Sequence, residues 1–393
     1  MTIVHVITRL ILGGAQENTL LTVDGLHHHY RDDVVLITGP AEGPEGDLFA
    51  RAKSRGLNVR LMPELVRAVR PATDLRAYRA LRKAMREIKP DVVHTHSSKA
   101  GIVGRAAAWN ARVPAVVHTI HGLPFGPSES AINNRVYVAA ERWAARRCHA
   151  MISVCHAMTE QALAAGVGRP EQYTTIYSGM DVDSFLNAGT RRAELRAAMR
   201  LESYHVAFAT VARLFERKGH DDLLQVAPRI LDANPNVRFV WIGSGVLRDR
   251  LQAEAERLGV AHAIHFTGIV PPDQIPELLA ACDAVIHPSL REGLARVLPQ
   301  SLLVERPAIS YDIDGAREVI IDDVTGYLLK PRDLDGLRNA MLRLAADADL
   351  RARLGQEGRR RCAQPFRQEV MVDQIRAVYE KLLGKNPLRR EPA

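Results

Sequence analysis

The 393-residue sequence predicts an α/β fold with two Rossmann-like domains, each built on a parallel sheet. Short apolar runs alternate with amphipathic stretches almost throughout the chain, a pattern typical of parallel sheets covered by helices on both faces. Ten such runs follow the strand expected at Thr2–Ile7. This number of strands is too large for one Rossmann-like sheet and indicates two sheets. They are Val34–Thr38, Val59–Met62, Val92–Thr95, Ala115–Ile120, Met151–Val154, Val206–Val211, Arg238–Ile242, Ile264–Phe266, Ala284–His287 and Ala308–Tyr311.

The boundary between the two domains is expected in the polar, charge-rich stretch from Asp183 to Glu202. This choice gives domains over residues 1–182 and 183–365. Helices are expected between the strands, for example at Asp74–Ile88 and Leu223–Ala233. A last helix is expected at Arg367–Leu383.

Cysteine usage and hydropathy favour a cytoplasmic protein. The sequence begins directly with a strand, without the charged and then apolar segment of a secretion signal. No apolar run has the length needed to cross a bilayer. The cysteines show no C-x-x-C pairing, so each is interpreted as a buried thiol in a reducing compartment. They are Cys148, Cys155, Cys282 and Cys362.

The segment from His287 to Pro307 lies between two apolar runs and carries most of the chemistry. Pro299 indicates the first turn of a helix, because proline is tolerated there. Glu292 and Gly293 therefore fall in the loop that enters the helix, where free N–H groups and the helix dipole favour an anion. A carboxylate is unusual beside an anion, and hydrogen bonds from sugar hydroxyls would explain it. The alternative is an ordinary crossover in which Glu292 is only a neighbour of the helix N-cap.

Two cations in the second half have the spacing of a diphosphate site. Arg213 and Lys218 follow the strand at Val206–Val211, and Gly219 opens the next helix. Charged donors five residues apart in such a loop suit a diphosphate better than a solvated surface would.

Paired glycines also follow the first strand. Gly13 and Gly14 at a turn from strand to helix would let a phosphate approach backbone N–H groups. Many such turns carry this pair for steric reasons alone. The G-x-G-x-x-G dinucleotide fingerprint is absent, which disfavours a nicotinamide enzyme.

These motifs resemble those of a known family. The stretch from Glu292 to Pro307, E-G-L followed by an apolar helix and R-P, is similar to the E-G-[FL]-x…E-A-x-x-x-G-x-P signature of the retaining family-four glycosyltransferases. Gln300 stands where that family has its second glutamate, and Glu305 where it usually has glycine. The resemblance covers nearly the whole chain. It implies a GT-B fold, in which two Rossmann-like domains face a central cleft and the last helix, 366–383 here, packs back on the first domain.

The resemblance also implies roles for individual residues. Glu292 and His121 would orient the donor sugar, and Arg213 and Lys218 would neutralise the departing diphosphate, so these four are the expected catalytic residues. Further donor contacts are implied at Gly13, Gly14, Gly243, Ser244, Ile269, Gly293, Leu294, Ala295 and Gln300. The candidates for acceptor or phosphate contacts are Gln16 and Lys99.

Four histidines near the ends of two adjacent strands raise the alternative of a metal site: His94, His96, His118 and His121. No acidic ligand accompanies them with suitable spacing, so a metal site is disfavoured. The resemblance implies instead that His121 lines the donor pocket. Lys99 and Arg105 on the following helix are interpreted chiefly as a solvated face. We expect no metal and no other cofactor.

The predicted function is transfer of a sugar from a nucleotide diphosphate sugar, a UDP-sugar, to a saccharide or lipid-linked acceptor, with retention of configuration. Such a reaction would serve cell-surface polysaccharide or glycolipid synthesis. Two alternatives stay open. One is a catalytically inactive nucleotide-sugar-binding protein, which the departures at Gln300 and Glu305 allow. The other is a GT-B nucleotide-sugar epimerase.

Basic residues are concentrated between residues 51 and 90, which hold twelve Lys and Arg against three acids, while the whole chain has a net charge of +8. A solvated helix face is one explanation. Nucleic acid is disfavoured, since few aromatic residues interleave with the charges. The other explanation is docking on the anionic inner face of the membrane. Leu65, Val66 and Val69 lie among Arg67 and Arg70, as in an interfacial segment.

Overall fold

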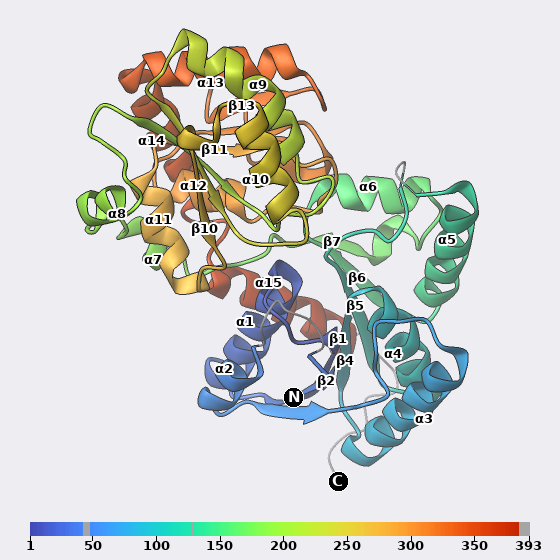
Figure 1. Ribbon diagram of the computed structural model, residues 1–393. Coiled ribbons are helices and arrows are strands. Elements are labelled where there is room, and N and C mark those ends of the chain that lie inside the picture. Colours follow the sequence, from blue (N-terminus) through green and yellow to red (C-terminus); the bar gives the residue numbers. More distant parts are fainter. Residues whose placement is uncertain (42–47, 127–128, 385–393) are drawn as a thin grey trace. The chain divides into compact units, whose positions relative to one another are not determined.

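The computed structural model describes residues 1–41, 48–126 and 129–384. It consists of two compact units (Figure 1). The N-terminal unit contains Met1–Met180 and the chain from Arg367 onward, and the C-terminal unit contains Asp181–Phe366. Among the helices of the described residues, none combines the length and the hydropathy that a bilayer-spanning segment needs.

The N-terminal unit is built on a seven-stranded parallel sheet with the strand order β3-β2-β1-β4-β5-β6-β7. All strands predicted in this half are present. The central runs are buried because helices cover both faces of the sheet, whereas the edge strand β3 is largely exposed, with Leu61 at 55%. The strands are β1 (Thr2–Arg9), β2 (Asp33–Gly39), β3 (Asn58–Leu61), β4 (Val92–His96), β5 (Ala115–Ile120), β6 (Ala150–Ser153) and β7 (Tyr173–Thr175).

Two helix layers cover this sheet. Side chains of α1 and α15 form one core with the sheet, and side chains of α3 and α4 form another. The two pairs of helices lie on opposite faces of the sheet (Figure 1). The final helix α15 packs directly on α1, where a Cβ on Gly25 would lie 2.7 Å from Val372. The helices are α1 (Gly14–His28), α2 (Phe49–Ser54), α3 (Pro71–Ile88), α4 (Ser98–Asn110), α5 (Ala131–Ala145), α6 (His156–Ala164), η1 (Pro170–Gln172) and α15 (Gln368–Gly384).

The C-terminal unit has a six-stranded parallel sheet with the order β10-β9-β8-β11-β12-β13. Its strands are β8 (Val206–Val211), β9 (Val237–Ile242), β10 (Ile264–Gly268), β11 (Ala284–His287), β12 (Ala308–Tyr311) and β13 (Gly326–Leu329). Its helices are α7 (Val182–Leu186), α8 (Arg192–Ala198), α9 (His220–Ala233), α10 (Arg248–Arg257), η2 (Ala261–Ala263), η3 (Pro272–Gln274), α11 (Ile275–Ala281), α12 (Val297–Leu303), η4 (Asp314–Glu318), α13 (Leu334–Ala346) and α14 (Ala348–Cys362).

Two strands, β7 and β13, were not expected from the sequence. Both are short edge strands of three or four residues; β7 is only Tyr-Thr-Thr, and β13 is Gly-Tyr-Leu-Leu. Gly326 begins β13 beside Ala308. A Cβ there would lie 1.9 Å from the carbonyl oxygen of Ala308, so glycine permits the two strands to pair.

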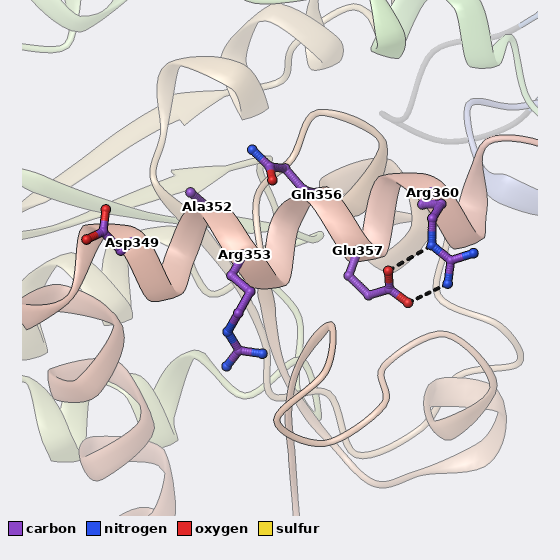
Figure 2. Close-up of a pocket in the computed structure, with 6 residues that line it drawn as sticks. All are labelled: Asp349, Ala352, Arg353, Gln356, Glu357 and Arg360. Atoms are coloured by element: carbon purple, nitrogen blue, oxygen red, sulfur yellow. Dashed lines mark hydrogen bonds and ion pairs between the residues drawn. The ribbon is translucent and has the colours of Figure 1, made fainter.

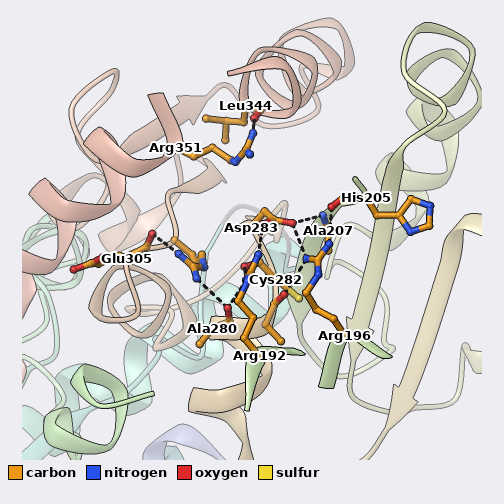
Figure 3. Close-up of polar contacts among 12 residues, drawn as sticks. Arg192, Arg196, His205, Ala207, Ala280, Cys282, Asp283, Glu305, Leu344 and Arg351 are labelled. Atoms are coloured by element: carbon orange, nitrogen blue, oxygen red, sulfur yellow. Dashed lines mark hydrogen bonds and ion pairs between the residues drawn. The ribbon is translucent and has the colours of Figure 1, made fainter. Parts of the chain in front are cut away.

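The charge-rich stretch expected to separate the domains is an integral part of the C-terminal unit. Arg192 and Arg196 of α8 bind the two carboxylate oxygens of Asp283 at 2.6 and 3.1 Å (Figure 3). The N–H of Ala207 in β8 donates to the same carboxylate at 2.8 Å. Burial would raise the pKa of Asp283, but this N–H and the two arginines hold it below its usual value. The charges therefore attach α8 to the sheet and do not form a linker.

Candidate functional site

The loops that follow β8 and β11 are held side by side by a backbone hydrogen bond at the carboxyl edge of the C-terminal sheet. The N–H of Leu290 donates to the carbonyl oxygen of Arg217 at 2.8 Å. Gly219 permits this approach, because its φ is 80° and a Cβ there would lie 2.1 Å from the carbonyl oxygen of Pro288. The cation-bearing loop is therefore held directly beside the loop that carries Glu292.

Lys218, Glu292 and His287 form a connected polar cluster in these loops. The Lys218 ammonium and the Glu292 carboxylate form an ion pair, and each side chain is 22% exposed. Nε2 of His287, the last residue of β11, lies 3.3 Å from the same carboxylate oxygen. The N–H of Glu292 donates to Oδ2 of Asp314 at 2.8 Å. Three segments of the unit therefore fix the position of this carboxylate.

The cluster keeps Glu292 ionised. Burial on its own would raise the pKa of Glu292, but the hydrogen bond from His287 and the positive charge of Lys218 outweigh burial and hold the pKa well below its usual value. An ionised carboxylate only accepts hydrogen bonds. Glu292 is therefore suited to orienting hydroxyl groups, and it is a poor general acid near neutral pH.

Other predicted donor contacts lie on neighbouring loops of the same edge. Arg213 is exposed, with its guanidinium 5.0 Å from the centre of the Phe215 ring. Gly243 directly follows β9 with φ 141°, and a Cβ there would lie 2.2 Å from the carbonyl oxygen of Ala212. Ile269 is 61% exposed just after β10. The strands of a parallel sheet all end at the same edge, so the loops that follow them lie together. These loops contain Arg213, Lys218, Gly243, Ser244, Ile269 and Glu292.

The helix after Glu292 is shorter than its apolar sequence suggests. α12 has seven residues and places Pro299 in its first turn, as predicted. Gly293, Leu294 and Ala295 are buried in the preceding loop, and the N–H of Gly315 donates to the carbonyl oxygen of Gly293 at 3.1 Å. Gln300 is half-buried on α12, eight residues beyond Glu292.

Glu305, the second departure from the family pattern, does not lie at this edge. It occupies the turn between α12 and β12, at the amino end of the strand. Its φ of 58° is in the left-handed region that favours glycine, which explains why the family usually has glycine there. Its carboxylate pairs with Arg359 at 3.2 Å. The substitution therefore affects a helix end rather than the donor site.

A cavity of about 240 Å³ lies at the carboxyl edge of the N-terminal sheet, where β4 and β5 end. Its lining includes His121, Ser97, Phe125 and Glu141, together with Ala15 at the start of α1. These groups combine an aromatic surface with a carboxylate, an imidazole and a hydroxyl, which is a chemistry suited to a sugar.

The predicted glycine turn borders this cavity. Gly13 precedes α1 and Gly14 is the exposed first residue of the helix, directly before Ala15 of the cavity. The side chain of Gln16 folds over the turn, because a Cβ on Gly13 would lie 2.7 Å from its Oε1. Glycine at residue 13 is therefore required for space and not for its φ of 169°, which any residue adopts.

Hydrogen bonds connect His121 to the buried core of the N-terminal unit. Its Nε2 lies 3.1 Å from Nδ1 of His96, and Nε2 of His96 lies 2.9 Å from Nδ1 of His5. The hydroxyl of Tyr379 in α15 continues the chain to His94. Burial lowers the pKa of His5 to about 3 and holds those of His94 and His96 well below their usual value. Neutral rings alternate donor and acceptor nitrogens, so His96 fixes the orientation of His121.

Neither Lys99 nor Arg105 forms a solvated face, so that interpretation was wrong. The Lys99 ammonium is 11% exposed and pairs with Asp74, and it also contacts the carbonyl oxygen of Ala68. Lys99 is not among the residues that line the cavity. Arg105 is fully buried, and its Nη2 lies 2.6 Å from Glu141.

Sequence reasoning missed several cavity residues. Ser97 directly follows β4 and has φ 62° and ψ 156°, a conformation that costs roughly 1–3 kcal/mol for a residue other than glycine. Its place at a strand end could have identified it. Phe125 and Glu141 carried no such signal, because Glu141 lies in the middle of α5 and reaches the cavity only through the packing of that helix on α4.

A second hollow lies away from the strand ends. It has about 470 Å³ and is lined by one side of α14 (Figure 2). Glu357 is paired there with Arg360 at 2.6 Å and with Arg361 at 2.6 Å. The charges are exposed and pair within one helix, as on an ordinary solvated surface, and we assign no role to this hollow.

Two parallel α/β units, one with a cation–carboxylate cluster and the other with a polar cavity at the strand ends, define a GT-B glycosyltransferase. Residues 13–179 match the model of the glycosyl transferase 4-like domain, and residues 192–361 match that of the glycosyl transferases group 1. The chain therefore belongs to these glycosyltransferases. The predicted family, fold and enzyme class are confirmed.

Known relatives are similar over nearly the whole chain. The UDP-Gal:alpha-D-GlcNAc-diphosphoundecaprenol alpha-1,3-galactosyltransferase of Escherichia coli is 27% identical over 380 residues, which cover 96% of each protein. The 2-deoxystreptamine glucosyltransferase of Streptomyces kanamyceticus is 26% identical, over 77% of this chain and 80% of that protein. The crystal structure of Anabaena Alr3699/HepE in complex with UDP-glucose has the same fold, with a TM-score of 0.83 at 22% identity, over 97% of this chain and 100% of that one.

Proposed function

We propose that this glycosyltransferase transfers a hexose from a UDP-sugar to a lipid-linked saccharide in polysaccharide synthesis, with retention of configuration. The cluster of Lys218, Glu292 and His287 carries the proposal, because it places a fixed cation beside a fixed carboxylate at the strand ends. The acceptor class is supported by the Escherichia coli relative, whose name specifies a diphosphoundecaprenol acceptor.

In this proposal the cations stabilise the leaving group. Arg213 and Lys218 would bind the diphosphate and neutralise the charge that develops as the glycosidic bond breaks. Glu292 would accept hydrogen bonds from the sugar hydroxyls, and His121 would orient the sugar from the N-terminal unit. The leaving phosphate itself would take the acceptor proton, as is often assigned in this family.

The chemistry of the side chains favours a reaction without metal. The carboxylates nearest the cations are engaged, Glu292 by Lys218 and Asp314 by the N–H of Glu292. Three buried histidines, His5, His94 and His96, have nitrogens within 4.8 Å of one another. Within the part of the chain that the structure describes, no carboxylate belongs to this group, and the nitrogens form the hydrogen-bonded chain described above. A divalent cation there would have no compensating negative charge.

Donor specificity can be measured directly. The purified protein is incubated with a panel of nucleotide sugars, with an undecaprenyl-diphosphate saccharide and with EDTA, and the products are identified by mass spectrometry and NMR. We expect transfer from a UDP-sugar, with retained configuration and no loss in EDTA. Hydrolysis and transfer that are both absent would favour the inactive binding protein, and a changed sugar without an acceptor would favour the epimerase.

The phosphate contacts give a quantitative prediction. Arg213→Ala and Lys218→Ala are each expected to weaken UDP binding about tenfold or more, because a charge-assisted hydrogen bond contributes roughly 1.5–3 kcal/mol. Binding of uridine should change far less. Calorimetry with both ligands measures the difference, and Arg229→Ala, on an exposed arginine of α9, is the control. Equal losses for uridine and UDP would remove this assignment.

Gln300 gives a second prediction. A neutral amide can accept from one ribose hydroxyl and donate to the other, so glutamine at this position is compatible with nucleotide binding. Gln300→Glu is therefore expected to keep kcat/KM within about an order of magnitude of the wild-type value. Steady-state kinetics with the identified donor test this. A hundredfold gain would support the interpretation that the natural enzyme is impaired, an interpretation that Glu305 no longer supports because of its position.

We further propose that the enzyme acts at an anionic membrane surface. The basic stretch between residues 51 and 90 supports electrostatic attraction, and α3 exposes Arg76, Arg79, Lys83 and Arg86. The apolar segment suggested by the sequence is corrected by the structure, because Leu65 is fully buried in the core of the N-terminal unit. Val69 alone is strongly exposed there, at 81%. Elsewhere in the stretch Leu61 is 55% and Leu75 47% exposed, so the stretch supplies charge and scattered apolar side chains rather than the predicted apolar segment.

A further inference from the structure

Helix α5 carries an apolar stripe on its outward side. Ile132 is 75% exposed, Val136 59% and Trp143 42%. At roughly 100° per residue, positions i, i+4 and i+11 fall within about 40° of one another around the helix. Glu141 and Ala145, on the opposite side, are buried. The helix thus has a packed inner face and a second apolar face that the described residues leave exposed, which indicates a surface for a partner.

Arginines border this stripe. The guanidinium of Arg147 lies 3.9 Å from the centre of the Trp143 ring. Glu141 is the one acid between residues 131 and 147, and it is turned inward and paired with Arg105. Within residues 131–147 the outward side therefore combines large apolar side chains with positive charge; Glu129 lies just before the helix. The arginines of this segment are Arg135, Arg142, Arg146 and Arg147.

These features favour an anionic bilayer over a second copy of the chain. In a symmetric dimer through α5, the arginines of one copy would face the same arginines of the other, which is unfavourable. A bilayer offers its acyl boundary to the apolar stripe and its phosphates to the arginines, and tryptophan is enriched at that boundary. The N-terminal unit has 28 basic and 19 acidic residues, a net charge of +9 that equals the excess between residues 51 and 90; it attracts the unit to such a surface without singling out α5.

We propose that α5 docks the N-terminal unit on an anionic lipid bilayer, with Ile132, Val136 and Trp143 inserted at the level of the headgroups. The benefit of docking rests on the proposed function. The inner side of α5 supplies Glu141 to the cavity, and Phe125, in the segment between β5 and α5, lines the same cavity. Docking would place the cavity next to a lipid-linked acceptor. Vesicle binding does not require sugar transfer, so either proposal can fail without the other.

Sedimentation with vesicles tests the docking surface. The wild-type protein is expected to bind an equal mixture of phosphatidylglycerol and phosphatidylcholine, and to bind phosphatidylcholine alone far more weakly. The triple variant Ile132→Ser, Val136→Ser, Trp143→Ser should lower the partition coefficient at least about tenfold, since it removes the apolar contact. Equal, negligible binding of the wild-type protein to both vesicles would overturn the proposal.

A charge-matched pair of variants separates docking by α5 from general attraction. Arg135→Gln with Arg146→Gln and Arg79→Gln with Arg86→Gln each remove two exposed arginines, from α5 and α3 respectively. Each arginine in contact with the surface is expected to contribute about fivefold to partitioning. The α5 pair should therefore lower the partition coefficient roughly 25-fold, and the α3 pair should lower it clearly less. Equal losses would assign the attraction to net charge alone and overturn a specific role for α5.

Fluorescence reports insertion independently of charge. Brominated lipids should quench Trp143 in the bound protein, and Trp143→Phe should abolish most of that quenching; Trp109, 41% exposed on α4, is the matched control, and the buried Trp241 is the internal reference. Bound protein whose Trp143 is not quenched would overturn insertion. Light scattering is the check for self-association, and a dimer that the triple substitution dissolves would also overturn the proposal. Circular dichroism and the UDP-sugar hydrolysis rate show that the variants remain folded and functional.

Discussion

Glu292→Gln is expected to lower kcat at least about a hundredfold while UDP binding stays equal or becomes tighter. The carboxylate is proposed to hold the sugar, and an amide is a weaker acceptor of hydrogen bonds from hydroxyls. The same carboxylate is paired with Lys218, so the substitution leaves the Lys218 charge available to a diphosphate. Catalysis and product affinity should therefore change in opposite directions, which a general loss of folding cannot produce.

Steady-state kinetics and calorimetry with UDP measure the two effects on the same preparation. His287→Gln is a matched control, because it removes the other hydrogen-bonding partner of the carboxylate without changing its charge. We expect this control to have a smaller effect on kcat than Glu292→Gln. A parallel loss of turnover and of UDP binding in Glu292→Gln would show that the carboxylate stabilises the conformation of its loop and does not bind the sugar.

Mild acid is expected to destabilise the N-terminal unit before the C-terminal unit. His5, His94, His96 and His118 are buried, and burial lowers their pKa values. In the unfolded chain these groups have a pKa of about 6.5. Below that pH the unfolded state binds protons that the folded state does not, so stability is complete above about pH 6.5 and is lost as the pH falls.

The expected loss is large. Between about pH 7.5 and 5.5 each such histidine costs about 1.4 kcal/mol, so the four together cost roughly 5–6 kcal/mol. The total free energy of unfolding of a domain is about 5–15 kcal/mol. In the C-terminal unit burial lowers the pKa of His220 to about 4, and smaller decreases affect His205 and His265. That unit should therefore lose less.

Pulsed hydrogen–deuterium exchange during urea unfolding, read by mass spectrometry, resolves peptides from the two units at each pH. The N-terminal unit is expected to unfold at a clearly lower urea concentration at pH 5.5 than at pH 7.5, and the C-terminal unit should shift much less. Equal shifts, or none, would show that the buried histidines become protonated without unfolding. Unfolding of the two units must be analysed separately, because a protein with two units need not unfold in one step.

The strand ends illustrate why the residues of the proposed donor site could be placed at one edge from the sequence. In a parallel α/β unit the residue after each strand lies at one edge, whatever the packing elsewhere. Glu292 follows β11 and Arg213 follows β8, so their location is a local property of the sequence. The cavity wall was not predictable in this way. The position of Glu141 depends on how α5 packs against α4 and on the buried ion pair with Arg105.

The structure adds information at two positions that the sequence left open. Glu305 departs from the family pattern and was taken to allow an inactive protein, but it lies at the opposite end of β12 from the candidate donor site. Lys99 was a candidate for an acceptor or phosphate contact beside Gly101; its charge pairs with Asp74 of α3, and the contact stays a prediction. A motif shows which residue type is present. It does not show which neighbouring residue forms an ion pair with that side chain.

The sequence by itself determined the α/β class, the family and the loops that carry the proposed donor-site residues. These properties depend on short-range periodicity and on the residues that directly follow each strand. The tertiary structure alone decided that Lys218 pairs with Glu292, 74 residues away. It also decided that the apolar stripe of α5 faces outward while Leu65 is buried. Periodicity shows that a helix has an apolar side, but only the packing of the other elements decides whether that side meets the core.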